Sequence, residues 1–156
     1  MINLATFADH LECYSVNGIQ FPDGTVQCLH VTVAWRCPTT YTIAAGERTT
    51  LQQLEAADAL YENGCGVMAE LTDTATGLHV LAGECFGHGS DGFVAVIDAA
   101  TNGLRWLAWF EDSNPFRELA LDGADLLATS TLGCRWRFPL ADPANCSVVC
   151  LERPSA

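Results

Sequence analysis

Lysine is absent from this 156-residue chain, whose seven basic residues are all arginine, against 19 aspartate and glutamate residues. The formal net charge is therefore −12. Nucleic-acid-binding proteins neutralise phosphates with clusters of lysine and arginine, so we expect no nucleic-acid partner. The surplus of acidic side chains favours a basic protein partner through its long-range field, although solubility alone is the other interpretation.

Long apolar runs are also absent. No run of 18 apolar residues occurs, so the sequence predicts no membrane contact through a spanning helix. The opening MINLATFADHLE has neither a basic start nor a long apolar stretch, and we expect no secretory signal. These two absences predict a cytoplasmic location. Hydrophobic residues make up 49% of the chain, which excludes a disordered protein, and the length predicts a single domain over residues 1–156.

The C-x₂-C pairs that are typical of structural zinc sites are missing, although the chain has eight cysteines. Cys85 with His88, or Cys146 with Cys150, would each offer two ligands, but the latter pair would lie about 13 Å apart on a straight strand. We therefore predict no metal and no cofactor. Without an export signal, reduced buried thiols, including that of Cys134, are favoured over a disulfide framework.

One segment, residues 49–63, has the pattern of a helix, because its apolar residues recur at every third or fourth position. Thr49 or Thr50 can cap its start, and Gly64 is expected just beyond its end. A second, shorter helix is expected within residues 5–14.

The sequence after residue 64 alternates short apolar runs with turn residues, which is typical of antiparallel strands. Two similar hairpins are predicted, GVMAELTD with LHVLAGECF and DGFVAVID with LRWLAWFE, and in each the loop ends in glycine. Asp122-Gly123 predicts the turn of a third hairpin. The segments GCRWRFPL and CSVVCLE are predicted to be later strands, and residues 25–35 are predicted to be an earlier strand. The predicted fold class is α+β, mostly an antiparallel β meander forming a bent sheet or sandwich, with one main helix.

Two of these strands, FVAVI and LRWLAWF, are apolar on both faces. Such strands lie in the middle of a sheet that is covered on both sides. A helix can cover one side, and a second sheet layer or a partner protein is needed on the other.

The stretch GECFGHGSDGFVAVID places Cys85, His88, Ser90 and Asp91 within seven positions. A cysteine nucleophile needs an imidazole within hydrogen-bonding reach, so a catalytic loop is one hypothesis. The favoured interpretation is a connection between two hairpins, in which serine and aspartate bond local backbone. The spacing G-x-G-x-x-G also occurs here, but a strand follows it rather than a helix, so it predicts no dinucleotide site.

Three segments within residues 87–140, GSDGFVAVID, LRWLAWFEDSNPF and ATSTLGCRWRFPL, resemble small bacterial immunity-type proteins that accompany polymorphic or contact-dependent toxins. The resemblance implies a cytosolic inhibitor of one cognate toxin domain, and it implies no catalytic or binding residue.

Together these features predict a non-enzymatic acidic protein of the immunity or inhibitor type that neutralises a basic toxin or effector domain. The expected partner contacts are Asp91, Trp109, Glu111 and Asp112. Two alternatives stay open: a hydrolase-like enzyme that uses Cys85 and His88, and a β-rich structural protein or homodimer.

Overall fold

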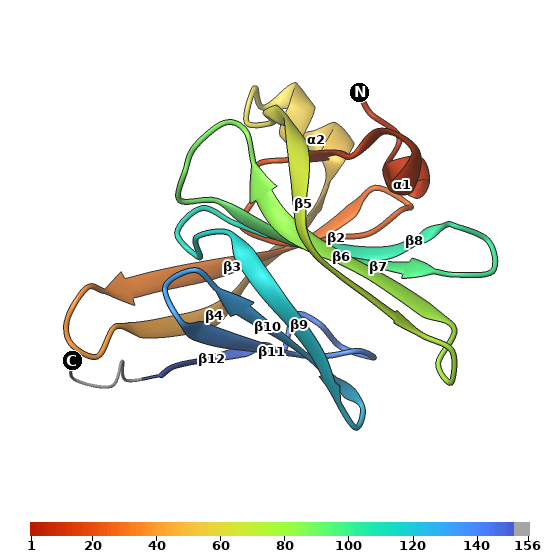
Figure 1. The fold of residues 1–156 in the computed structure, drawn as a ribbon. Coiled ribbons are helices and arrows are strands. Elements are labelled where there is room, and N and C mark those ends of the chain that lie inside the picture. The colour runs from red at the N-terminus through yellow and green to blue at the C-terminus, as the bar shows by residue number, and fades with distance from the viewer. Residues whose placement is uncertain (152–156) are drawn as a thin grey trace.

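Antiparallel strands make up most of the computed structural model, which describes residues 1–151 (Figure 1). The larger sheet has eight strands in the order β1-β5-β6-β7-β8-β2-β3-β4. Its strands are β1 (Glu12–Tyr14), β2 (Gly18–Gln20), β3 (Thr25–Ala34), β4 (Thr40–Thr50), β5 (Glu62–Asp73), β6 (Leu78–Cys85), β7 (Gly92–Asp98) and β8 (Leu104–Phe110). The smaller sheet, in the order β12-β11-β10-β9, contains β9 (Phe116–Asp122), β10 (Asp125–Ser130), β11 (Cys134–Pro139) and β12 (Ser147–Cys150).

The predicted hairpins are present. Strand β5 pairs with β6 up to Asp73 and Leu78, and β7 pairs with β8. The two loops reach a positive φ at different positions, however, since Gly77 has φ 68° in the first and Asn102 has φ 60° in the second. Asparagine tolerates this conformation better than most residues. The third hairpin turns at Gly123, whose φ is 59°, and the mostly antiparallel β architecture expected from the sequence is confirmed.

The main helix is much shorter than predicted. Only Leu51–Ala56 is helical (α2), and it follows β4 directly. The hydroxyl of Thr50 accepts a hydrogen bond from the Gln53 amide at 3.1 Å, as expected for a cap. The prediction that the helix reaches residue 63 and ends at Gly64 was wrong: Asp58 takes a left-handed φ of 54°, and residues 62–64 pair with β1. Strand pairing here overrides helix propensity.

The second expected helix, within residues 5–14, is present only in part, as a 3-10 turn η1 (Leu4–Thr6) and α1 (Phe7–His10), because residues 12–14 form β1. Leu11 ends α1 in a left-handed conformation with φ 50°. No helix among residues 1–151 reaches the length and hydropathy that a membrane span requires.

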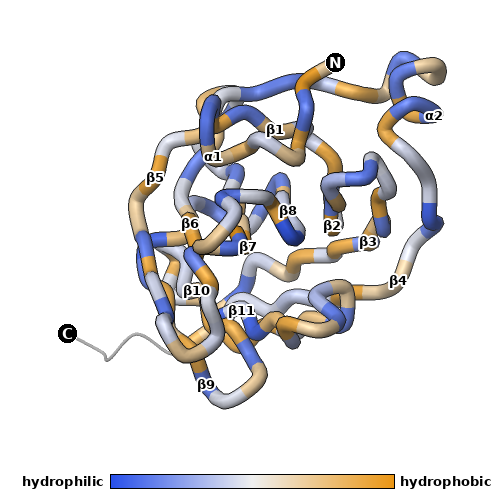
Figure 2. Tube along the Cα trace, turned by 90° about the vertical axis from the view of Figure 1, so that its right-hand side faces the viewer, coloured by the Kyte–Doolittle hydropathy of each residue, from blue (hydrophilic) through white to orange (hydrophobic). Residues whose placement is uncertain are grey.

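The larger sheet is covered on both faces, which gives two cores (Figure 2). Along β7, Phe93 and Ile97 point into one core, and Val94 and Val96 point into the other. The cap core lies beneath the N-terminal segment, where the rings of Phe7 and Phe93 are 5.8 Å apart. The sandwich core lies between the two sheets. The sequence left two possibilities for covering the second face of the central strands, another sheet layer or a partner protein. The structure shows that the smaller sheet covers it.

Candidate functional site

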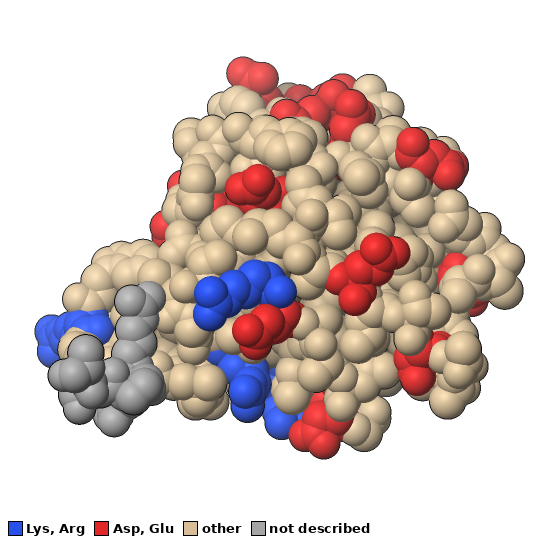
Figure 3. Space-filling view, viewed as in Figure 1, with Lys and Arg blue, Asp and Glu red and all other residues tan. Residues whose placement is uncertain are grey.

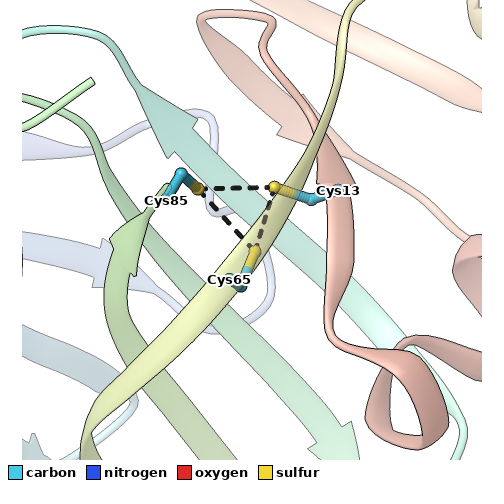
Figure 4. A group of neighbouring side chains, drawn as sticks. All are labelled: Cys13, Cys65 and Cys85. Atoms are coloured by element: carbon cyan, nitrogen blue, oxygen red, sulfur yellow. Dashed lines mark hydrogen bonds between the residues drawn. The ribbon is translucent and has the colours of Figure 1, made fainter. Parts of the chain in front are cut away.

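Three buried cysteines meet in the cap core at one end of the larger sheet (Figure 4). Cys13 comes from β1, Cys65 from β5 and Cys85 from the end of β6. The sulfur atoms of Cys13 and Cys65 are 3.3 Å apart, those of Cys13 and Cys85 3.6 Å, and those of Cys65 and Cys85 3.7 Å. We call this group the cysteine trio.

Strand register brings the cysteine trio together. Cys65 lies directly opposite Cys85, and Cys13 lies opposite Asn63, two residues before Cys65. Side chains two residues apart on a strand share a face, so all three thiols point the same way. Nothing in the sequence spacing of 13, 65 and 85 indicates this proximity, because it depends on how β1 and β6 flank β5.

The three thiols differ in acidity. The contact with Cys65, then that with Cys85, and then burial raise the pKa of Cys13. Hydrogen bonds from Cys13 and Cys65 lower the pKa of Cys85, and the indole N–H of Trp109 acts in the same direction. Cys85 is therefore the sulfur of the three that most readily carries negative charge.

Asp91 is fully buried near the cysteine trio. Among the described residues, neither of its carboxylate oxygens has a hydrogen-bond partner. Burial and then the charge of Cys85 raise the pKa of Asp91 to about 6; Glu111 and Asp112 act in the same direction, and His88 opposes them. The expectation that this carboxylate bonds local turn backbone was wrong, because its side chain points into the protein rather than along the turn.

A pocket of about 500 Å³ opens at the surface beside the trio. Trp109, which is 4% exposed, lines this pocket. Glu62 and Glu111 are its acidic side chains and His88 is its one basic side chain. We call it the acidic pocket, and its lining is Ser15, Asn17, Tyr61, Glu62, Asn63, His88, Trp109 and Glu111.

Local hydrogen bonds fix the wall of the acidic pocket. The Asn17 side chain accepts a bond from the Glu111 amide at 2.9 Å, which ties the end of β8 to the segment between β1 and β2. The amide of Asn63 donates to the hydroxyl of Ser15. These contacts join the segment between β1 and β2 to β5 and to the residue after β8. No pattern in the sequence indicates Ser15, Asn17 or Glu62 as site residues.

The four residues expected to contact a partner fall into two classes. Glu111 and Asp112 are exposed, and the main-chain carbonyl of Asp112 accepts a hydrogen bond from Tyr41 at 2.7 Å. Asp91 is buried and Trp109 is only 4% exposed. The structure thus places Trp109 and Glu111 in one pocket, whereas Asp91 is buried and does not line it.

Cys85 and His88 do not form the pair that the hydrolase hypothesis requires. Within residues 1–151 no hydrogen bond joins them: the Cys85 thiol is 3% exposed and contacts the other two thiols, whereas His88 lies at the surface. The geometry therefore lacks an imidazole positioned to activate this thiol.

A disulfide joins Cys134 to Cys150. The expectation of reduced thiols was wrong for this pair, because β11 and β12 place the two residues directly opposite each other. Cys146 precedes β12 and keeps a free thiol.

No protein-family model, no curated protein and no solved structure matches the chain. The interpretation of the site therefore depends on its geometry and chemistry.

Proposed function

We propose that the protein is a non-enzymatic binding protein of the immunity or inhibitor type, which holds a basic side chain of a partner protein in the acidic pocket. One observation carries the proposal: an open pocket of about 500 Å³ is lined by Glu62 and Glu111 and, among residues 1–151, by no arginine. The resemblance of residues 87–140 to immunity-type proteins supports the same class.

Acidic side chains outside the lining also contribute to the negative potential that we expect in the acidic pocket. Glu111 and Asp112 both raise the pKa of Asp91, which means that the three carboxylates act on the same region. An incoming guanidinium would form charge-assisted hydrogen bonds with an exposed carboxylate. It would also find aromatic faces, because Tyr61, which is 67% exposed, stands at the rim. Tyrosine and arginine are favoured at the centres of protein interfaces.

Several of the protein's own arginines are held by acidic partners elsewhere. Arg137 pairs with Asp122 and Asp125 in the smaller sheet, and Arg105 pairs with Asp98 in the β7–β8 hairpin. On the face drawn in Figure 3, the basic side chains lie in the lower and left-hand part with acidic ones beside them, whereas the upper part has acidic side chains and no basic ones. This separation favours approach of a basic partner away from the smaller sheet.

A labelled arginine-rich peptide tests the proposal by fluorescence anisotropy at low ionic strength. We expect binding that weakens with added salt, because exposed charges are screened. Glu111→Gln should weaken binding by about two- to fivefold, the size of one exposed charge pair. In an NMR spectrum, the indole N–H resonance of Trp109 should shift on peptide addition.

Glu47→Gln is the matched control, because Glu47 is an exposed acid on β4 and outside the acidic pocket. Equal weakening by Glu47→Gln and Glu111→Gln would show that the peptide senses only net charge, and would overturn the proposal. Failure of the peptide to bind at low salt would overturn it too.

A further inference from the structure

We infer that the cysteine trio is a binding site for a thiophilic divalent cation of the zinc type. Cys13, Cys65 and Cys85 present three sulfur atoms to one point. The site is separate from the proposed partner contact, and neither proposal depends on the other.

The sulfur spacing fits tetrahedral coordination. A tetrahedron with zinc–sulfur bonds of about 2.3 Å has sulfur–sulfur edges of about 3.8 Å. Two of the distances in the structure, 3.6 and 3.7 Å, lie within about 0.2 Å of this edge, and the third, 3.3 Å, is about 0.5 Å shorter. A trigonal-planar site with bonds of the same length needs about 4.0 Å and fits less well. Three protein ligands leave the fourth tetrahedral position for a solvent molecule.

The backbone holds the thiols in this arrangement. Gly83 packs so closely on β5 that an added Cβ would lie 2.0 Å from the carbonyl oxygen of Gly66. This close contact brings β5 and β6 together next to Cys65 and Cys85. Because the ligands come from three paired strands rather than from a loop, the site is formed before any ion binds.

The charge balance also favours a cation. Asp91 is fully buried, and neither of its carboxylate oxygens has a hydrogen-bond partner among residues 1–151. A buried anion is costly unless it is compensated. A divalent ion would stabilise the thiolates and reduce the cost of ionising Asp91. Asp91 lies outside the group of ligand atoms that are all within 4.8 Å of one another, so we assign it no coordination bond.

Cobalt titration tests the site in the intact, reduced protein under anaerobic conditions. We expect one equivalent of Co²⁺ to produce the sulfur-to-metal charge-transfer band and the visible bands of tetrahedral thiolate coordination, and Zn²⁺ to displace it. Cys13→Ser and Cys85→Ser should each abolish the bands. Zinc should also raise the melting temperature of the wild-type protein and leave that of these variants unchanged.

Two controls separate the trio from the other thiols. Cys28→Ser should keep the cobalt spectrum, and so should the double variant Cys134→Ser/Cys150→Ser, because none of these residues belongs to the trio. If a trio variant fails to fold, the test uses the wild type instead, whose cysteines are alkylated in mild urea and mapped. Zinc should then slow the labelling of Cys13, Cys65 and Cys85 but not that of the other cysteines. A folded, reduced wild type without thiolate–cobalt absorption overturns the inference, as does a spectrum that survives in Cys13→Ser and Cys85→Ser.

Discussion

The two cores share the central strands but differ in chemistry. In the sandwich core, Trp136 packs against Phe110 at 4.4 Å between ring centroids and against Phe116 at 5.8 Å. The cap core instead contains three thiols and adjoins Asp91, a buried carboxylate without a partner among the described residues. Well-packed aromatic rings stabilise a fold, whereas uncompensated polar groups cost stability and mark candidate sites. One face of β7 therefore packs into an aromatic core, and the other packs into a core that contains three thiols.

The largest effect is expected in the sandwich core. Trp136→Ala should lower the free energy of unfolding by about 3–5 kcal/mol, because it removes a fully buried ring that four aromatic neighbours contact. Urea denaturation followed by circular dichroism measures the change. Trp35→Ala is the control, since Trp35 is 59% exposed, and should cost less than about 1 kcal/mol. A similar decrease in the free energy of unfolding for both variants would contradict the prediction that packing in the sandwich core stabilises the fold.

The disulfide of the smaller sheet should have the next largest effect. Cys134 and Cys150 are 16 residues apart, and closing such a loop contributes about 3 kcal/mol in the chain-entropy model. The variant Cys134→Ser/Cys150→Ser should lose about that much stability in urea. Reductant should destabilise the wild type and leave the double variant unchanged. A wild type whose unfolding is indifferent to reductant would show that the bond is not present.

The cap core should be stabilised, not weakened, by removing its buried charge. The pKa of Asp91 is about 6 in the folded protein, against 3.8 for the unperturbed group, so the folded state binds the proton more tightly. Its contribution to stability is therefore greatest below about pH 4 and is lost as the pH rises to about 6. Asp91→Asn should increase the free energy of unfolding by on the order of 2 kcal/mol at about pH 7.5.

The pH dependence itself is the control for Asp91→Asn. Wild type and variant should have nearly equal stability near pH 4, where Asp91 is protonated in the folded protein. A constant difference between the two proteins across this range would mean that the substitution acts through packing. A variant that is less stable at neutral pH would show that the carboxylate has a favourable partner.

Much of the fold could be predicted from the sequence, because local patterns determine it. Alternating apolar residues and turn glycines located the hairpins β5–β6, β7–β8 and β9–β10. The two-sided hydrophobicity of FVAVI correctly indicated a strand covered on both faces. The helix at residues 49–63 was overestimated, since the same apolar spacing is compatible with a strand once β1 is available as a neighbour of residues 62–64.

The site was only partly predictable. Trp109 and Glu111 were selected as contacts from charge and aromatic character, and they do lie in one pocket. Glu62 is 49 positions away from Glu111, and no local pattern connects them. Asp91 is predicted as a surface contact because aspartate is common in glycine-rich turns, but in the structure its side chain is fully buried.

By itself, the sequence determined the net charge, the antiparallel strands and the two apolar faces of the central strands, since composition and residue periodicity encode these directly. Only the tertiary structure decided which cysteines meet. Cys13, Cys65 and Cys85 come together through the order β1-β5-β6, and Cys134 meets Cys150 through the register of β11 and β12. Strand order and register depend on contacts between residues far apart in the chain, and so no local reading of the sequence contains them.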